Sequence, residues 1–178
     1  MTLAKLTLVL GGAASGKSLF AENLLCAHAA KQVYIATAQA FDEEMRQKIS
    51  AHRSRRGDGW RTVEAPLDVP SALQQAKAGE AILLDCATLW LTNHLMAGND
   101  LADETDRLLS ALAACTAPVI VVSNETGMGV VPENSLSRAF RQAQGELNQR
   151  LAAQADLAVF VLAGLPMLLK GTLPKGTI

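Results

Sequence analysis

The sequence has few cysteines, almost no net charge and no long apolar run. Its three cysteines, Cys26, Cys86 and Cys115, are scattered without the spacing of a metal site, which is typical of a reduced, cytoplasmic protein. The formal net charge of -1 gives no general attraction to nucleic acid or to an anionic membrane. No apolar run reaches the ~18 residues that a membrane-spanning helix needs. These absences argue against a membrane protein and against a general nucleic-acid binder.

The size and composition are those of a globular protein. The 178 residues suggest one domain, 1–178, that is long enough to bury a core. Hydrophobic residues make up 49% and charged residues 19% of the chain, and we find no repeat, low-complexity tract or linker. The first apolar run leads directly into a phosphate-binding motif, so we expect it to be a strand and not a signal peptide.

Apolar runs and helical patterns alternate along the chain. Strands are expected at Leu6–Leu10, Val33–Ala38, Ala81–Cys86, Pro118–Ser123 and Leu157–Ala163. Helices are expected at Lys17–Ala30, Asp42–Arg55, Val69–Ala78, Asp100–Cys115 and Ser135–Ala155. This alternation predicts an α/β fold with a mostly parallel sheet and helices on both faces. The tail Leu165–Ile178 carries two prolines and two glycines, and we expect it to be irregular.

The string GGAASGKS matches the P-loop pattern G-x-x-x-x-G-K-[ST] between an expected strand and an expected helix. Its residues are Gly11, Gly12, Ala13, Ala14, Ser15, Gly16, Lys17 and Ser18. The glycines let backbone N–H groups point at phosphate oxygens, and the helix N-terminus adds its positive dipole end. Lys17 supplies charge to the β- and γ-phosphates, and the Ser18 hydroxyl can bind Mg²⁺. A plain glycine turn would not require the Lys-Ser pair, so the motif predicts a nucleoside triphosphate site.

Acidic and polar residues end two of the expected strands. Asp85 closes the run AILLD, and in P-loop proteins such an acid holds Mg²⁺ or its waters. The alternative role for Asp85 is to cap the helix-like stretch that follows it. Asn124 and Glu125 end the fourth strand, at the edge where α/β sheets bind ligands. Glu125 could bind Mg²⁺, act as a base on an acceptor hydroxyl, or cap the loop.

A basic segment surrounds His52. Residues 46–61 contain six of the chain's 16 Lys and Arg: Arg46, Lys48, Arg53, Arg55, Arg56 and Arg61. The segment could be a solvated helix face, a nucleic-acid patch or an anion site. The near-neutral total charge and the lack of interleaved aromatic residues weaken the second possibility. In the third, the arginines bind phosphate and the imidazole attacks phosphorus. Residue types alone favour the solvated face.

Taken in order, these strings resemble the bifunctional adenosylcobinamide kinase / adenosylcobinamide-phosphate guanylyltransferase family of cobalamin biosynthesis. The resemblance runs from the P-loop to about Lys170. It is carried by GGAASGKS, YIATAQAFDEEMRQKI, HRSRR with Trp60 and RTVEAP after it, ILLDCATLWLTN, and SNETGMGVVPENSLSRAFRQAQGELNQRLAAQAD. A P-loop alone is weak evidence, whereas the ordered set is highly specific.

The resemblance implies roles for individual residues. His52 falls on the histidine that becomes guanylylated, and we predict that it and Lys17 are catalytic. Ser18 and Asp85 are the predicted metal ligands, and some relatives have Glu in place of Asp85, which keeps the carboxylate. Further nucleotide contacts are implied at Ala36, Thr37, Ala38, Arg53, Ser54, Arg55, Arg56, Glu64 and Asp85.

The resemblance also implies the chemistry. The cofactors are ATP, GTP and Mg²⁺, and the substrates are adenosylcobinamide and adenosylcobinamide phosphate. A γ-phosphoryl group passes to the hydroxyl of the aminopropanol arm of adenosylcobinamide. His52 then attacks the α-phosphorus of GTP, and the GMP-histidine gives adenosylcobinamide-GDP. The family is similar in fold to RecA-type P-loop proteins and forms a homotrimer, in which we expect the corrinoid to dock between subunits.

Two other classes of protein stay open at this point. A P-loop small-molecule kinase without a covalent step predicts that His52 can be replaced at little cost. A non-enzymatic nucleotide-binding module, or a RecA-like motor, predicts salt-dependent nucleic-acid binding, against which the near-neutral charge argues. The remaining histidines and the tryptophans are expected to be structural: His28, His94, Trp60 and Trp90.

Overall fold

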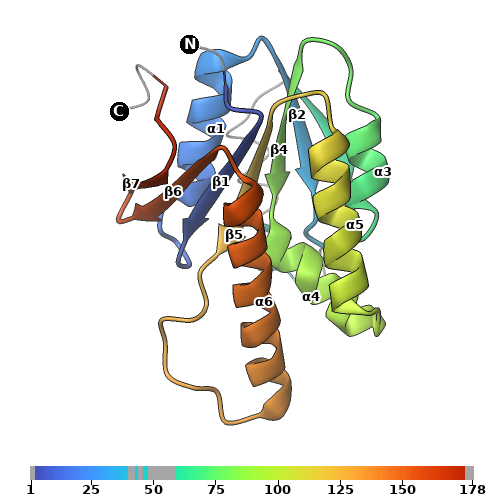
Figure 1. The fold of residues 1–178 in the computed structure, drawn as a ribbon, viewed down its shortest axis with the longest axis vertical. Coiled ribbons are helices and arrows are strands. Elements are labelled where there is room, and N and C mark those ends of the chain that lie inside the picture. The colour runs from blue at the N-terminus through green and yellow to red at the C-terminus, as the bar shows by residue number, and fades with distance from the viewer. Residues whose placement is uncertain (1–2, 40–42, 44–45, 48–58, 175–178) are drawn as a thin grey trace.

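The computed structural model describes residues 3–39, 43, 46–47 and 59–174. The described strands form one seven-stranded sheet in the order β3-β2-β4-β5-β1-β6-β7 (Figure 1). They are β1 (Leu6–Gly11), β2 (Lys31–Ala36), β3 (Trp60–Glu64), β4 (Glu80–Asp85), β5 (Val119–Asn124), β6 (Leu157–Leu162) and β7 (Leu165–Lys170). All neighbouring pairs are parallel except β6 and β7, so the expected mostly parallel sheet is confirmed.

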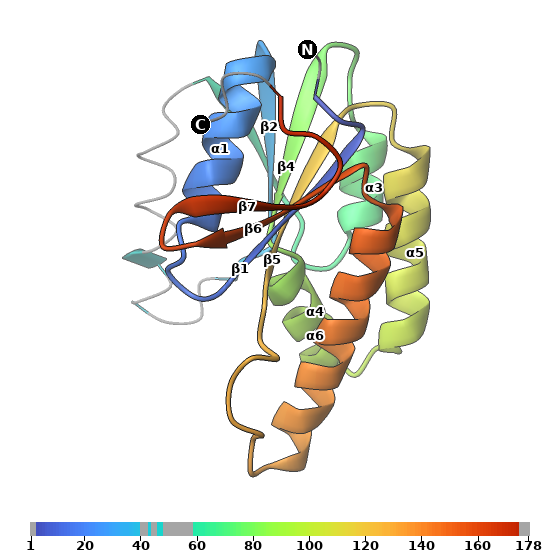
Figure 2. The same cartoon turned by 60° about the vertical axis from the view of Figure 1, so that its left-hand side comes forward.

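Helices cover both faces of the sheet. The described helices are α1 (Lys17–His28), α3 (Val69–Gln74), α4 (Ala87–Ala97), α5 (Leu101–Ala114) and α6 (Ser135–Gln154). Figures 1 and 2 show α1 on one face and the other helices on the opposite face. None of the helices within the described ranges is both long enough and apolar enough to cross a lipid bilayer. The expectation of helices on both faces is therefore confirmed.

The core has two layers because the central strands are buried on both faces. Alternate residues of β1 point to opposite sides, so Leu8 packs in the layer that holds Trp90 of α4. Val9 packs in the other layer with Leu24 of α1. Every residue of β1 is buried. Burial on both faces explains why the central strands appear in the sequence as unbroken apolar runs.

The expected elements agree with the structure apart from their ends. All five expected strands are present, and their ends are shifted by up to two residues. The helix expected at Val69–Ala78 ends earlier, at Gln74, and α4 occupies the helix-like stretch after Asp85. The helix expected at Asp42–Arg55 falls mostly outside the described residues.

The expectation of an irregular tail is wrong for Leu165–Lys170. This segment is β7, which pairs antiparallel with β6. Ala163 and Gly164 join the two strands with φ values of 52° and 78°, and two positive φ values are typical of a tight hairpin turn. Pro166 is tolerated because β7 is an edge strand. The other edge strand, β3, was also missed, since its partly exposed residues form no continuous apolar run.

Gly171 tests the β6–β7 hairpin, because its φ is +79° and an added Cβ would overlap the carbonyl oxygen of Asp156. Gly79 has the same φ of +79° but no neighbouring atom within 4 Å of the added Cβ. Gly79→Ala should lower the free energy of unfolding by about 1–2 kcal/mol through backbone strain alone. Gly171→Ala should cost at least ~1 kcal/mol more, measured by urea denaturation. Equal losses would contradict the close packing of the end of β7 against Asp156.

Candidate functional site

The P-loop connects the carboxyl end of β1 to the start of α1. Gly16 is the N-cap of α1 with a left-handed φ of 91°, and no side chain caps the helix. The first backbone N–H groups of a helix have no partner within the helix, and here they start from a glycine-rich turn. Such a helix N-terminus attracts an anion through its N–H groups and its dipole. The local backbone is therefore suited to phosphate.

The hairpin turn between β6 and β7 packs against the P-loop. Gly164 donates its N–H to the carbonyl of Ser15 at 2.8 Å, and a Cβ on Gly16 would lie 3.1 Å from the Gly164 Cα. A Cβ on Gly11 would lie 2.6 Å from the carbonyl oxygen of Val161. These two glycines are needed because backbone from β6 and its turn lies against the loop. Gly12 has open space around its Cβ position.

Lys17 lies over the P-loop. Its Nζ donates to the carbonyl of Gly12 at 2.9 Å. Burial lowers the pKa of the Lys17 ammonium, while the nearby Asp85 carboxylate acts in the opposite direction. The lysine is thus partly desolvated and close to the carboxylate that ends β4. A phosphate at the helix N-terminus would give this cation a stronger partner.

Most of the described residues that we predicted for the site lie along one edge of the sheet. Ala36, at the end of β2, pairs in register with Glu64 at the end of β3 and with Asp85 at the end of β4. Gly11 and Asn124 pair at the ends of β1 and β5. Ala38 lies in the loop that follows β2. The predicted residues His52, Arg53, Ser54, Arg55 and Arg56 lie outside the described residues.

Thr37 is fully buried, and its hydroxyl bonds to the protein backbone. Its Oγ1 donates to the carbonyl of Cys86 and accepts from the Cys86 N–H, both at 2.8 Å. Through these bonds Thr37 fixes the end of β2 to the end of β4. The nucleotide contact implied at Thr37 stays a prediction, and the structure shows its hydroxyl engaged with Cys86.

Helix α4 holds the loops that leave β2 and β3. Asn93 donates its side-chain N–H groups to the carbonyls of Thr37 and Pro66, both at 2.8 Å. Trp90 donates its ring N–H to the carbonyl of Leu67 at 2.9 Å, and the His94 ring lies 3.2 Å from the same oxygen. The sequence analysis missed Asn93, because nothing in the sequence distinguishes it from a polar residue on the solvent side of the helix.

The expected structural roles of the tryptophans and of His94 agree with these contacts. Trp90 is fully buried, and the rings of Trp60 and Tyr34 meet edge to face at 6.3 Å. Cys86 has a structural role as well, since its sulfur accepts from the Leu89 N–H at the start of α4. Burial, assisted by the charge of Asp85, raises the pKa of the Cys86 thiol to about 12, so the thiol stays neutral.

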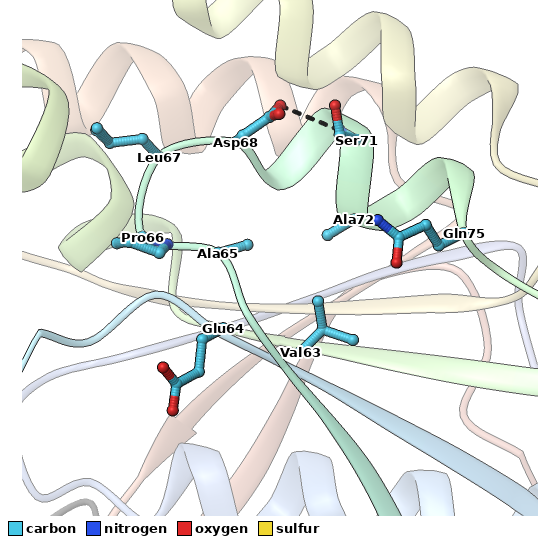
Figure 3. A pocket seen from close by; sticks show the side chains of 9 residues that line it. All are labelled: Val63, Glu64, Ala65, Pro66, Leu67, Asp68, Ser71, Ala72 and Gln75. Carbon is cyan, nitrogen blue, oxygen red and sulfur yellow. Dashed lines mark hydrogen bonds between the residues drawn. The ribbon is translucent and has the colours of Figure 1, made fainter.

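A pocket of roughly 380 Å³ opens between the end of β3 and α3 (Figure 3). The lining residues come from the strand end, the loop and the helix: Val63, Glu64, Ala65, Pro66, Leu67, Asp68, Ser71, Ala72 and Gln75. Asp68 accepts from the Ser71 N–H and so caps α3. In Figure 3 the Glu64 carboxylate points away from α3. The pocket thus lies beside one of the predicted nucleotide-binding acids.

Ser18 and Asp85 are suited to a magnesium ion that arrives with a nucleotide. Both offer oxygen, the ligand atom that Mg²⁺ prefers, and Asp85 lies near Lys17 of the same loop. Within the described ranges no cluster of three or more His, Cys, Asp or Glu residues could hold a metal alone. Mg²⁺ usually binds one or two protein oxygens together with phosphates and waters, so this small donor set fits it.

Glu125 bonds to the first residue of the P-loop through its backbone and to the loop after β5 through its side chain. Its N–H donates to the carbonyl of Gly11 at 3.0 Å, and its carboxylate accepts from the Gly127 N–H at 2.5 Å. Of the three roles left open by the sequence, these contacts favour the loop cap.

Replacing Lys17 by Met should remove triphosphate binding without unfolding the protein. The variant should lose the rise in melting temperature that wild type shows with ATP or GTP, because the phosphates lose their cation. The nucleotide-free variant should lose no more than ~1 kcal/mol of stability, because the lysine is partly desolvated. Lys31→Met removes the same charge from an exposed strand end and should keep the shift. A normal shift in Lys17→Met would contradict the assignment.

Known structures share this fold. An ATPase from the type III secretion system of pathogenic bacteria aligns with a TM-score of 0.54 at 10% identity over 89% of this chain and 51% of that chain. A structure from Pyrococcus horikoshii aligns with a TM-score of 0.56 at 8% identity over 96% of this chain and 88% of the other. The P-loop between β1 and α1, the strand order and the ATPase neighbour confirm the expected RecA-like P-loop fold.

Sequence comparisons identify the family. The chain is 47% identical over 167 residues to the bifunctional adenosylcobalamin biosynthesis protein CobP of Pseudomonas aeruginosa, covering 92% of this chain and 96% of that protein. It is 41% identical over 179 residues to CobU of Salmonella typhimurium, a protein of the same description, covering 92% and 98%. The family model for cobinamide kinase / cobinamide phosphate guanyltransferase matches residues 7–169. The resemblance seen in the motifs is confirmed, and the chain belongs to the cobinamide kinase / cobinamide phosphate guanyltransferase family.

Proposed function

We propose that this protein phosphorylates adenosylcobinamide with ATP or GTP and then transfers GMP from GTP to adenosylcobinamide phosphate. The product is adenosylcobinamide-GDP, and the reactions take place in the cytoplasm. The observation that carries the proposal is the family match over residues 7–169, which spans a fully formed P-loop with Lys17 beside Asp85. The bifunctional relatives are covered almost end to end, so both activities come within the matched length.

The kinase step depends on positioning and on charge. The N–H groups at the start of α1 and the Lys17 ammonium hold the phosphates, so negative charge that develops during transfer is already matched. Ser18 and Asp85 hold Mg²⁺, which supplies further charge neutralisation when it is bound. The hydroxyl of the aminopropanol arm attacks the γ-phosphorus, releases its proton to solvent and displaces the nucleoside diphosphate.

The guanylyl step uses His52 as a nucleophile. An imidazole nitrogen forms a bond to the α-phosphorus of GTP, and the bond to the β-phosphate oxygen breaks with release of pyrophosphate. The phosphate of adenosylcobinamide phosphate then attacks the GMP-histidine and frees the imidazole. Two transfers through a covalent intermediate replace one difficult transfer between two large anions. The neighbouring Arg53, Arg55 and Arg56 supply positive charge for the triphosphate and the leaving pyrophosphate.

The covalent step is tested by intact-mass spectrometry under denaturing conditions after incubation with GTP and Mg²⁺. Wild type should carry a guanylyl adduct, and His52→Ala should carry none because it lacks the nucleophile. His28→Ala is the matched control, since His28 lies at the end of α1, and it should keep the adduct. Absence of the adduct from wild type that binds GTP would leave a P-loop kinase without a covalent step as the better assignment.

The same proposal includes a homotrimer, as the family resemblance implies. An uncovered apolar edge of the sheet supports assembly. β7 ends the sheet, and four of its apolar side chains are 46–71% exposed: Leu165, Met167, Leu168 and Leu169. Consecutive residues of a strand point to opposite faces, so both faces of β7 are apolar and uncovered in the single chain. Such an edge is a liability in a monomer and is suited to a subunit contact.

Light scattering coupled to gel filtration should give the mass of three chains for wild type. Placing two carboxylates on one face of β7, in Leu165→Glu with Met167→Glu, should shift the mass toward one chain because charge is buried poorly at an apolar contact. Met96→Glu adds one carboxylate at a 75% exposed position of α4 and should leave the trimer intact. A trimeric double variant would exclude β7 from the interface, and a monomeric wild type would exclude the trimer.

A further inference from the structure

A buried polar network joins α4, β5 and α6 directly behind the P-loop edge. Its four side chains belong to Thr88, Ser123, Gln144 and Asn148, and each is at most 6% exposed. Asn148 accepts from the Ser123 hydroxyl at 2.7 Å and from the Gln144 amide at 3.0 Å. The Ser123 hydroxyl accepts from Gln144 at 3.0 Å and lies 3.4 Å from the Thr88 hydroxyl. These groups are costly to bury and are hydrogen-bonded to one another.

Two members of the network bind the backbone of Asn124. Thr88 Oγ1 accepts the Asn124 N–H at 2.8 Å, and the Asn148 side-chain amide donates to the Asn124 carbonyl at 3.0 Å. One bond comes from α4 and the other from α6. Both backbone groups of Asn124 are therefore fixed by side chains from helices far apart in the sequence.

The sheet itself explains why side chains are needed at this point. The last pair between β4 and β5 joins Asp85 to Val122, so β5 runs two residues past the end of β4. On its other side β5 stays paired with β1 as far as Asn124 and Gly11, and the Glu125 N–H continues with a bond to the Gly11 carbonyl. Thr88 and Asn148 replace the missing β4 partner.

Asn124 consequently occupies a fixed place beside the nucleotide site. It pairs with Gly11, the first P-loop residue, and ends β5, the strand next to the one that ends in Asp85. Asn124 is a partly exposed polar residue at the carboxyl edge of the sheet, the edge where α/β sheets bind their ligands. Small displacements of such groups cost rate more than they cost binding.

We propose that Thr88 and Asn148 are positioning residues for phosphoryl transfer, which hold Asn124 and the start of the following loop against the P-loop in the reacting geometry. The inference rests on the proposed kinase function and adds a requirement to it. Nucleotide binding depends on the P-loop backbone and Lys17, and no hydrogen bond among the described residues joins these groups to Thr88 or Asn148. Loss of the hydrogen bond from either Thr88 or Asn148 to Asn124 therefore lowers kcat and leaves the KM for ATP almost unchanged.

The test compares isosteric variants. Thr88→Val keeps the shape but removes the acceptor for the Asn124 N–H, and Asn148→Asp places an oxygen against the Asn124 carbonyl. Thr88→Ser restores the hydroxyl. Thr7→Val is the matched control, because Thr7 lies at the far end of β1 and its buried hydroxyl has no partner among the described residues. Each variant is assayed for phosphoryl transfer from ATP to adenosylcobinamide, for thermal stability, and for amide hydrogen exchange at Asn124 and Glu125.

We expect kcat to fall about 10- to 100-fold in Thr88→Val and Asn148→Asp, with the KM for ATP within about threefold of wild type. Thr88→Ser should recover most of the rate, and Thr7→Val should match wild type. Amide hydrogen exchange at Asn124 and Glu125 should become faster in Thr88→Val and should stay unchanged in the control Thr7→Val. If Asn148→Asp does not fold, the Thr88 series decides the question.

A normal kcat in Thr88→Val with only a lower melting temperature would overturn the inference and leave a purely structural network. If wild type transfers no phosphate to adenosylcobinamide, the proposed function fails on its own. Hydrogen exchange then still tests whether Thr88 holds the backbone of Asn124. Faster exchange at Asn124 in Thr88→Val supports this role, and unchanged exchange overturns it.

Discussion

The carboxyl edge of the sheet depends on hydrogen bonds from α4 to the loops that leave β2, β3 and β5. Asn93 binds the loops that follow β2 and β3, and Thr88 binds Asn124, the last residue of β5. Each bond joins a buried side chain to a backbone group, and a buried backbone group left without its partner costs about 1–3 kcal/mol. The loops cannot shift away from α4 without that loss. The ends of the strands beside the P-loop are therefore in place before a nucleotide arrives.

Without a bound anion, the P-loop contains a partly desolvated lysine whose positive charge is destabilised by burial. Burial lowers the pKa of Lys17, so the folded chain binds this proton less tightly than the unfolded chain does. The protonated lysine accordingly destabilises the nucleotide-free fold below its folded pKa, and the effect fades as the pH rises toward 10.5. A triphosphate bound at the P-loop would favour the charged lysine and would accept hydrogen bonds from the N–H groups at the start of α1. Binding energy at this site thus includes the relief of a cost already present in the free protein.

The sequence was most informative where burial is complete. Strands such as β1 are covered on both faces and appear in the sequence as continuous apolar runs. The P-loop appears as a motif, and its Gly11 and Gly16 lie close to neighbouring backbone. The edge strands β3 and β7 were not predicted, because each is partly exposed and lacks a continuous apolar run typical of a strand buried on both faces. Asn93 and Asn148 could not be recognised, since a polar residue on a helix looks the same whether it faces solvent or a loop carbonyl. The part of the site around His52 still rests on sequence alone.

Packing alone does not explain the polar network behind β5. Apolar side chains between α4, β5 and α6 would fill the same space, and replacing buried polar groups by well-packed apolar ones is often neutral or stabilising. Such a core would leave the N–H and carbonyl of Asn124 without partners, because β4 ends two residues too early to supply them. β4 ends there because the next residue, Cys86, is the N-cap of α4. The start of α4 thus ends β4 early, and Thr88 and Asn148 supply the backbone partners of Asn124 that the shortened strand lacks.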